Sequence, residues 1–240
     1  IIHINKKQSM GTNKQGNLYV AIGHGNHGSD PGACANGTTE YKECLRIGQH
    51  VTGYTDIKLV PINLSLKERI QWVRKNLTPL DTLIELHMNA AAPAAQGSDI
   101  FYRTEDKNAG QLAQRILHMY CRESGIKERL VIGDTNSRHG RLGIIRDVQC
   151  QSFLIELGFL TNENDLNSVR AKAERALLTT LTDLFTIPLH TMKEEVPQWM
   201  QDACTWVKEN DLSNGERPLE TITRGEAFEL LRKFTSFIKK

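Results

Sequence analysis

Short apolar runs alternate along the chain with longer segments in which apolar residues recur every three or four positions. The runs have strand length and are bounded by polar or glycine-containing segments, which predicts β-strands. They lie at residues 18–22, 57–60, 82–86, 99–103, 130–134, 142–146 and 152–159. Helical spacing is found at residues 64–77, 108–124 and 166–184. Strands that alternate with helices indicate an α/β fold, with a twisted, mostly parallel sheet flanked by helices.

The first of these helices carries its own start signal. Ser65 is followed three residues later by Glu68, which is the spacing of a capping box. The apolar positions after it have helical spacing: Leu66, Ile70, Val73 and Leu77. We therefore expect a helix that begins directly after Ser65.

The alternation of strands and helices ends near Pro188, and a different pattern follows. The predicted organisation is an N-terminal extension at 1–17, one domain at 18–188, a linker at 189–196 and a small C-terminal helical unit at 197–240. In the last segment, Trp199 and Trp206 share one helical face, and Thr223 and Glu226 form a second capping box. Because so short a unit is near the lower limit for folding alone, we expect it to lean on the main domain or on a partner.

Composition and charge restrict the class of protein. Hydrophobic residues make up 39% of the chain and charged residues 24%, as in soluble globular proteins. The net charge of +2 and the isoelectric point near 8.3 are too mild to predict a nucleic-acid partner. No apolar run approaches the roughly 18 residues of a membrane span, and no signal peptide is visible. We therefore expect neither nucleic acid nor a membrane span.

The cysteines indicate where the chain is made. There are five of them, an odd number, and no two form a C-x-x-C pair. This pattern is typical of reduced thiols in a protein made in a cytosol, and it disfavours a zinc site built from thiolates.

Polar residues that can carry chemistry stand where predicted strands end. His24 follows the first strand, His87 follows the run at 82–86, and Glu156 lies at the close of the last run. Glu40 opens the helix after the first long loop. Because ligands bind beyond the carboxyl ends of parallel strands, we expect these side chains to converge. Two histidines and a carboxylate are common ligands of catalytic Zn²⁺, and a further carboxylate would serve as general base.

Four blocks in this order resemble a known family. They are "GHGNHGSDPGA", "TTEYKECLRIG", "ELHMNA" and "FLIELGFLTNENDL". The stretch from residue 18 to about residue 184 is similar to the zinc-dependent N-acetylmuramoyl-L-alanine amidases of the amidase-3 type. The resemblance implies that His24, Glu40 and His87 bind Zn²⁺ and that Glu156 is the catalytic carboxylate. It also implies the reaction, hydrolysis of the amide between N-acetylmuramic acid and L-alanine in peptidoglycan.

The chain departs from the family pattern at two places. The first block carries an extra Asn26 and His27, so His27 competes with His24 as a ligand; the glycine-flanked His24 is favoured, and Glu43 is the alternative to Glu40. Glu85 stands where the family usually has serine. Residues two apart on a strand point to the same face, so we expect Glu85 to orient His87 or to assist proton transfer. No substrate-binding residue is assigned.

The C-terminal segment resembles a single surface-layer-homology repeat, on the strength of its T-R-x-E helix start at Thr223–Glu226. Such a unit would bind a polymer of the bacterial cell wall; a helical pair that mediates dimerisation is the alternative. Together these features favour a phage endolysin that stays in the host cytoplasm until lysis and then acts on the cell wall. The rival functions are a zinc peptidase acting on stem peptides and a wall-binding protein without catalysis.

Overall fold

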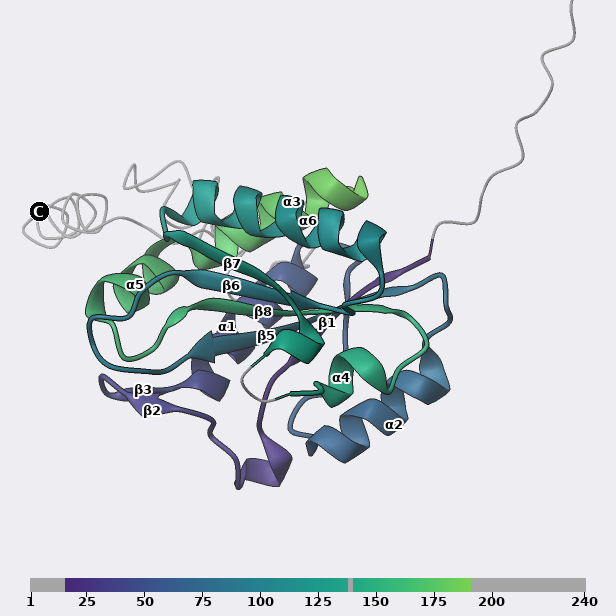
Figure 1. Cartoon of the computed structure of the whole chain (residues 1–240), viewed down its shortest axis with the longest axis horizontal. Coiled ribbons are helices and arrows are strands. Elements are labelled where there is room, and N and C mark those ends of the chain that lie inside the picture. Colours follow the sequence, from purple (N-terminus) through teal and green to yellow (C-terminus); the bar gives the residue numbers. More distant parts are fainter. Residues whose placement is uncertain (1–15, 138–139, 191–240) are drawn as a thin grey trace, which may run out of the picture. The chain divides into compact units, whose positions relative to one another are not determined.

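A central mixed sheet organises the part of the chain that the structure describes, residues 16–137 and 140–190 of a computed structural model. Its six strands are ordered β4-β1-β5-β8-β6-β7 (Figure 1). Their bounds are Lys58–Leu59 (β4), Leu18–Ile22 (β1), Thr82–Asn89 (β5), Gln151–Phe159 (β8), Ser98–Tyr102 (β6) and Glu128–Gly133 (β7). All neighbours pair in parallel except β6 and β8, which are antiparallel. The predicted α/β fold with a mostly parallel sheet is confirmed.

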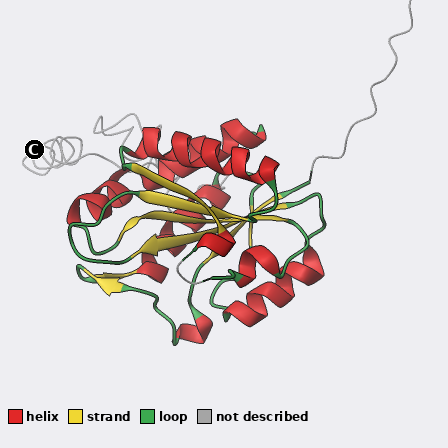
Figure 2. Cartoon of the chain, viewed as in Figure 1, coloured by secondary structure: helices red, strands yellow, loops and turns green. Residues whose placement is uncertain are grey.

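Helices cover both faces of the sheet (Figure 2). One face packs against α1 (Glu40–Gly53), α3 (Lys107–Ser124) and α6 (Glu174–Phe185). The other face packs, over β1, β5 and β8, against α2 (Leu66–Asn76) and the short α4 (Gly143–Arg146). The remaining elements are η1 (Asn26–Gly28), β2 (Cys34–Ala35), β3 (Thr38–Thr39), η2 (Asp134–Asn136), α5 (Glu163–Ser168) and η3 (Val169–Ala173).

The second helix begins where its capping box predicts. The Ser65 hydroxyl accepts a hydrogen bond from the Glu68 backbone N–H, and the Glu68 carboxylate accepts one from the Ser65 backbone N–H at 2.8 Å. These two bonds satisfy two backbone N–H groups around the start of α2, which fixes the first residue of the helix as Leu66.

The strand predicted at residues 142–146 is wrong, because this segment forms the helix α4. Ile144 and Ile145 are buried in the cluster that α2 also joins. The Arg103 guanidinium donates to the carbonyl oxygens of Ile145, Arg146 and Val148 at the helix end. A short apolar run cannot distinguish a buried strand from a buried helical turn, and here the tertiary contacts decide.

The single helix predicted at residues 166–184 is interrupted. It consists of α5, a π-helical segment η3 and α6. A π turn adds one residue to a turn without altering the apolar character of the buried side, so the sequence pattern does not reveal it. Val169 and Ala173, both in this segment, are fully buried.

Several predictions fall largely outside the described residues. These are the N-terminal extension at 1–17, the linker at 189–196 and the helical unit at 197–240, which stay predictions. Within the described ranges, no helix combines the length and apolarity needed to cross a membrane.

Candidate active site

Four side chains from separate segments meet near the carboxyl ends of the neighbouring strands β1, β5 and β8. His24 lies two residues after β1, Glu40 is the first residue of α1, and His87 lies near the end of β5. Glu156 stands directly beside His87, because these two residues are register partners in the parallel β5–β8 pair. β5 extends to Asn89, beyond the end of its predicted run, so His87 lies within the strand and not after it. β8 ends at Phe159, as its run predicts, and Glu156 lies inside it.

Glu40 is the centre of a compact trio with the two histidines. Its Oε1 lies 2.8 Å from His87 Nδ1, and its Oε2 lies 3.1 Å from His24 Nε2. One ligand atom from each of the three residues lies within 4.8 Å of the others. The backbone N–H groups of Ala33 and Met88 each donate to the Glu40 carboxylate at 3.0 Å. The carboxylate is therefore fixed before any ion binds.

A second carboxylate holds the far side of each imidazole. His24 Nδ1 lies 3.0 Å from Asp30, and His87 Nε2 lies 2.9 Å from Glu85. The same-face relation expected for Glu85 and His87 is thus present, and the nitrogens His24 Nε2 and His87 Nδ1 are left facing Glu40. Metal-binding histidines commonly have such an outer carboxylate, which fixes the ring orientation.

A buried arginine connects the two halves of this arrangement. Arg69 Nε forms an ion pair with Glu85 Oε2 at 2.7 Å, and the two side chains are only 4% and 1% exposed. Arg69 Nη1 also donates to the backbone carbonyl of His24 at 3.2 Å. Arg69 therefore contacts both the carboxylate that orients His87 and the turn that carries His24.

The electrostatics of the trio suit a cation. Burial raises the pKa of Glu40, but the hydrogen bonds with His24 and His87 outweigh it and hold the carboxyl well below its usual range. Burial lowers the pKa of His87, but contacts with Glu40 and Glu85 raise it to about 10. His24 shows the same balance, with a raised pKa despite burial. The carboxylates around the two imidazoles therefore favour positive charge at this place.

Close backbone approach explains two glycines of the site. A Cβ on Gly23 would lie 2.4 Å from the His87 ring, and a Cβ on Gly32 would lie 2.6 Å from Glu40 Oε2. His24 itself has a positive φ of 64°, a strained conformation for a residue with a side chain. Such strain is typical of functional turns that the surrounding structure holds in place.

Glu156 differs from the other carboxylates of the site. Its Oε2 is buried and has no hydrogen-bond partner among the described residues. Burial raises the pKa of Glu156 to about 7, against the opposing influence of His87. A carboxyl with a pKa near neutrality can both accept and donate a proton, which is the requirement for general acid–base chemistry.

The comparison with protein families decides between the classes that this geometry allows. Residues 18–182 match the amidase-3 family model, described as N-acetylmuramoyl-L-alanine amidase. The chain belongs to this amidase family. The reaction of the family is hydrolysis of the amide between N-acetylmuramic acid and L-alanine in peptidoglycan, and family membership supports this activity for the chain.

Individual proteins are similar to the chain in sequence or in fold. YqiI, an uncharacterized protein of Bacillus subtilis (strain 168), is 27% identical over 164 residues, which cover 63% of this chain and 74% of YqiI. The solved structure of an N-acetylmuramoyl-L-alanine amidase from Clostridium difficile 630 has a TM-score of 0.59 at 20% identity, covering 72% of this chain and 98% of that one. The catalytic domain of CD27L, an endolysin targeting Clostridia difficile, has a TM-score of 0.55 at 20% identity, with the same coverages. These structures have the fold of the present amidase.

Residues that competed for a place in the amidase site lie elsewhere. His27 is 64% exposed and pairs with Glu68 at 3.0 Å, so it does not join the trio. Glu43 accepts hydrogen bonds from Thr38 and Arg170, and the group of possible metal ligands among the described residues does not include it. The insertion in the first block is therefore absorbed by the turn, and the glycine-flanked His24 is the histidine that faces Glu40.

Asp30 and Arg69 belong to the site but carry no clear signal in the sequence. Asp30 is part of an Asp-Pro-Gly stretch, which is most simply a turn. Arg69 lies within an amphipathic helix whose charged positions normally face solvent. One signal points toward Arg69: Glu85 stands on a strand as a buried carboxylate, and such a group requires a cation.

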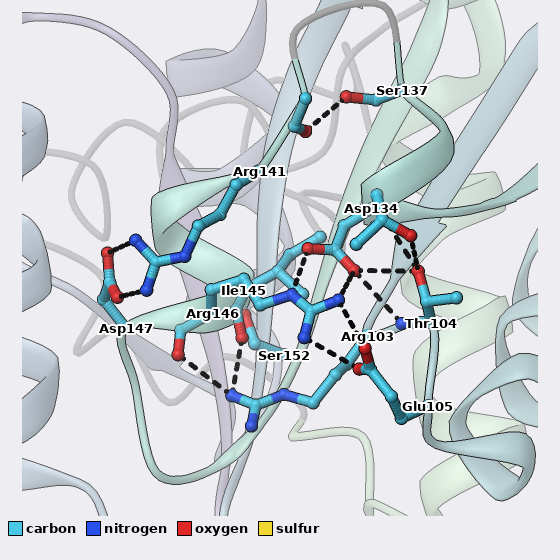
Figure 3. A network of polar contacts seen from close by, with 12 residues as sticks. Arg103, Thr104, Glu105, Asp134, Ser137, Arg141, Ile145, Arg146, Asp147 and Ser152 are labelled. Atoms are coloured by element: carbon cyan, nitrogen blue, oxygen red, sulfur yellow. Dashed lines mark hydrogen bonds and ion pairs between the residues drawn. The ribbon is translucent and has the colours of Figure 1, made fainter.

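A groove of about 230 Å³ extends from Glu156 over β6 and β7. Its lining includes Asn89, Asp99, Arg129, Asn136, Ser137 and Glu156. Ion pairs fix the segment that carries Asn136: Figure 3 shows Arg146 bound to both Asp134 and Glu105. The amidase therefore has a preformed depression directly beside the carboxylate proposed to carry protons.

Proposed function

We propose that the chain is a zinc-dependent N-acetylmuramoyl-L-alanine amidase in which His24, Glu40 and His87 hold the metal. The observation that carries this proposal is the convergence of the three side chains, with each imidazole fixed from behind by a second carboxylate. Two imidazoles and one carboxylate are a common ligand set of catalytic zinc, with room left for water or substrate. Family membership supports the same metal.

When bound, Zn²⁺ supplies Lewis acidity that polarises the scissile carbonyl and makes water more acidic. Glu156 takes a proton from the water molecule that attacks the carbonyl carbon. As the C–N bond breaks, Glu156 delivers this proton to the leaving nitrogen of L-alanine. The products are the lactyl carboxyl group of N-acetylmuramic acid and a stem peptide with a free L-alanine amine. Glu40 and the outer carboxylates Asp30 and Glu85 keep the two imidazoles in place.

The experiment is a comparison of the wild-type amidase with Glu156→Gln. We expect both proteins to contain zinc, and the variant to hydrolyse muramoyl peptides about 10²- to 10⁴-fold more slowly, because the proton carrier is lost. Glu163→Gln, on the exposed start of α5, is the matched control and should keep full activity. Full activity of Glu156→Gln would contradict the assignment of Glu156 as the proton carrier.

The products separate this function from a zinc peptidase. An amidase releases intact stem peptides with new L-alanine amino termini, whereas a peptidase shortens the stem. A wall-binding protein without catalysis would pellet with purified walls and leave their turbidity unchanged.

The biological setting that we propose is lysis of the host by a phage endolysin, stored in the cytoplasm and acting on the cell wall. The described cysteines, Cys34, Cys44, Cys121 and Cys150, are free thiols, which suits folding in a reducing compartment. The catalytic domain of CD27L, an endolysin targeting Clostridia difficile, has a similar fold. Residues 197–240 are proposed to bind a wall polymer.

A further inference from the structure

The groove beside Glu156 contains a charged pair that the proposed proton transfer does not use. Arg129, the second residue of β7, forms an ion pair with Asp99 of β6, at 2.7 Å between Nη1 and Oδ2. The Arg129 guanidinium carbon also lies 5.0 Å from the centre of the Phe159 ring. These two contacts fix the position of the guanidinium in the lining of the groove.

The two members of the pair differ sharply in burial. The Asp99 side chain is 3% exposed, whereas that of Arg129 is 38% exposed. Asp99 Oδ2 also accepts a hydrogen bond from the Asn89 amide at 3.2 Å. A guanidinium has five N–H donors, and the described residues use one of those of Arg129. Asp99 thus positions an arginine whose remaining donors are open to the groove.

A second buried acceptor lies in the same groove. Asp99 Oδ1 is buried and has no hydrogen-bond partner among the described residues, which is the condition also found for Glu156 Oε2. Asp99 and Glu156 face each other across the β6–β8 pair. A buried carboxylate oxygen without a partner is costly unless a ligand supplies a donor. The groove therefore offers a positive group and an acceptor side by side, next to the reaction centre.

The positive charge of Arg129 favours the half of the substrate that carries a carboxylate. In the muramoyl amide, the lactyl carboxyl is consumed in the scissile bond, so the sugar side offers no carboxylate there. The stem peptide continues from L-alanine to a D-glutamate linked through its γ-carboxyl, whose α-carboxyl is either free or amidated. Glu156 and Arg129 are separated by two strand spacings, about 10 Å between backbones. Two extended residues span about 7 Å, and the two side chains cover the remainder.

We propose that the groove is the stem-peptide subsite and that Arg129 binds the free α-carboxylate of the second stem residue. Asp99 is the positioning residue that holds Arg129, and its Oδ1 accepts an N–H of the peptide. The inference rests on the proposed amidase function and adds a preference: the chain favours stems with a carboxylate at this position over stems with a carboxamide.

The test uses two soluble muramoyl tripeptides that differ only in this group. Both end in a neutral, C-terminally amidated residue, so that the α-carboxylate or α-carboxamide of the second residue is the single difference. We expect the wild-type protein to favour the carboxylate by about 10- to 100-fold in kcat/KM, the range of one charge-assisted hydrogen bond. The preference should appear in KM and not in kcat, and should weaken with added salt.

Variants at Arg129 make the test specific. Arg129→Gln should bring the ratio of the two substrates close to one, mainly through a fall of kcat/KM for the carboxylate substrate. Arg129→Lys keeps the charge and the pairing with Asp99, and should retain part of the preference. Arg122→Gln, which removes an exposed arginine paired with Glu123 on α3, is the matched control and should leave the ratio unchanged.

The outcomes separate this inference from the proposed function. A wild-type ratio near one, or a preference that survives in Arg129→Gln, overturns the assignment of Arg129 while amidase activity stands. Failure of the wild-type protein to hydrolyse either substrate, with metal present, contradicts the proposed function itself.

Discussion

At Glu40, two imidazoles and two backbone N–H groups converge on a single carboxylate. Two of the side chains involved are also anchored from the opposite side, His24 by Asp30 and His87 by Glu85. Such preorganisation means that metal binding would not have to order the ligands, and the entropy cost of ordering would already be met by folding.

Arg69 supports the two histidines without contacting their ring nitrogens, through Glu85 and the backbone carbonyl of His24. We expect Arg69→Met to lower the free energy of unfolding by about 3 kcal/mol, the low end of the range for a broken buried ion pair, because Glu85 keeps only its contact with His87. Zinc affinity should fall by about 10- to 100-fold, since the carboxylate behind His87 loses its partner. Chemical denaturation and competition with a chelating dye measure the two effects.

The double variant Arg69→Met/Glu85→Gln is the control for the buried pair. It removes the orphaned charge, so it should recover stability relative to Arg69→Met alone, without recovering zinc affinity. A single Arg69→Met variant as stable as the wild-type protein would show that the ion pair does not support the site.

At the residue scale, the sequence predicts best where side chains on regular strands lie. His87, Glu156 and Glu85 lie on strands, where the two-residue period states which face each side chain occupies. Asp30 and Arg69 were not found, because their contacts arise from a turn of positive φ angles and from a helix that packs against it. Arg129 was not found either, because its role depends on strand order in the sheet.

At the scale of elements, α4 and the ends of β6 and β7 are connected by a polar network (Figure 3). Arg146 of α4 donates to Asp134 and to Glu105, and Thr104 donates to Asp134. This network is also the physical reason why residues 142–146 form a helix where their apolar pattern predicted a strand. The favourable contacts of Arg146 and Arg103 depend on segments distant in sequence, so no local pattern could reveal them.

Asp134 gives this network a pH dependence. Burial raises the pKa of Asp134, but hydrogen bonds from Arg146 and Thr104 outweigh it and hold the pKa below its ordinary value. A carboxyl with a lowered folded-state pKa contributes stability that is fully present above the unfolded value of about 3.9. That contribution is lost as the pH falls through the folded-state pKa.

We therefore expect Asp134→Asn to cost about 2 kcal/mol of unfolding free energy at pH 7, the range for hydrogen bonds to charged groups. The difference between wild type and variant should shrink between pH 5 and about pH 2. Denaturation at a series of pH values measures it. Asp147→Asn, which removes the partner of the exposed Arg141, should show little effect at either pH. A constant difference down to the lowest pH would exclude the proposed titration of Asp134.

At the scale of the whole molecule, the order of the strands does most to build the site. β1, β5 and β8 are neighbours, so the residues near their carboxyl ends meet, as the alternating pattern predicted. The reversal at β6 was not predicted: β6 runs antiparallel to β8 and places Asp99 beside Glu156. Strand direction follows from the connections and the packing of helices, which apolar periodicity does not encode.

One prediction concerns residues 197–240, which lie outside the described residues. A protein that ends at His190 should hydrolyse soluble muramoyl peptides as the full chain does, because the trio and Glu156 lie before this point. It should no longer pellet with purified cell walls, if residues 197–240 bind a wall polymer. Equal pelleting of both forms would reject that role. The molecular mass of both forms in analytical ultracentrifugation tests the alternative, dimerisation.

Zinc content measured after equilibrium dialysis tests the central claim, the shared ion of His24, Glu40 and His87, most directly. We expect about one zinc ion per wild-type chain, the stoichiometry of a single catalytic site. His24→Ala, Glu40→Ala and His87→Ala should each lose it, while His27→Ala, the neighbouring histidine that pairs with Glu68, should keep it. Retention of zinc by His24→Ala together with its loss in His27→Ala would contradict the arrangement described for this site.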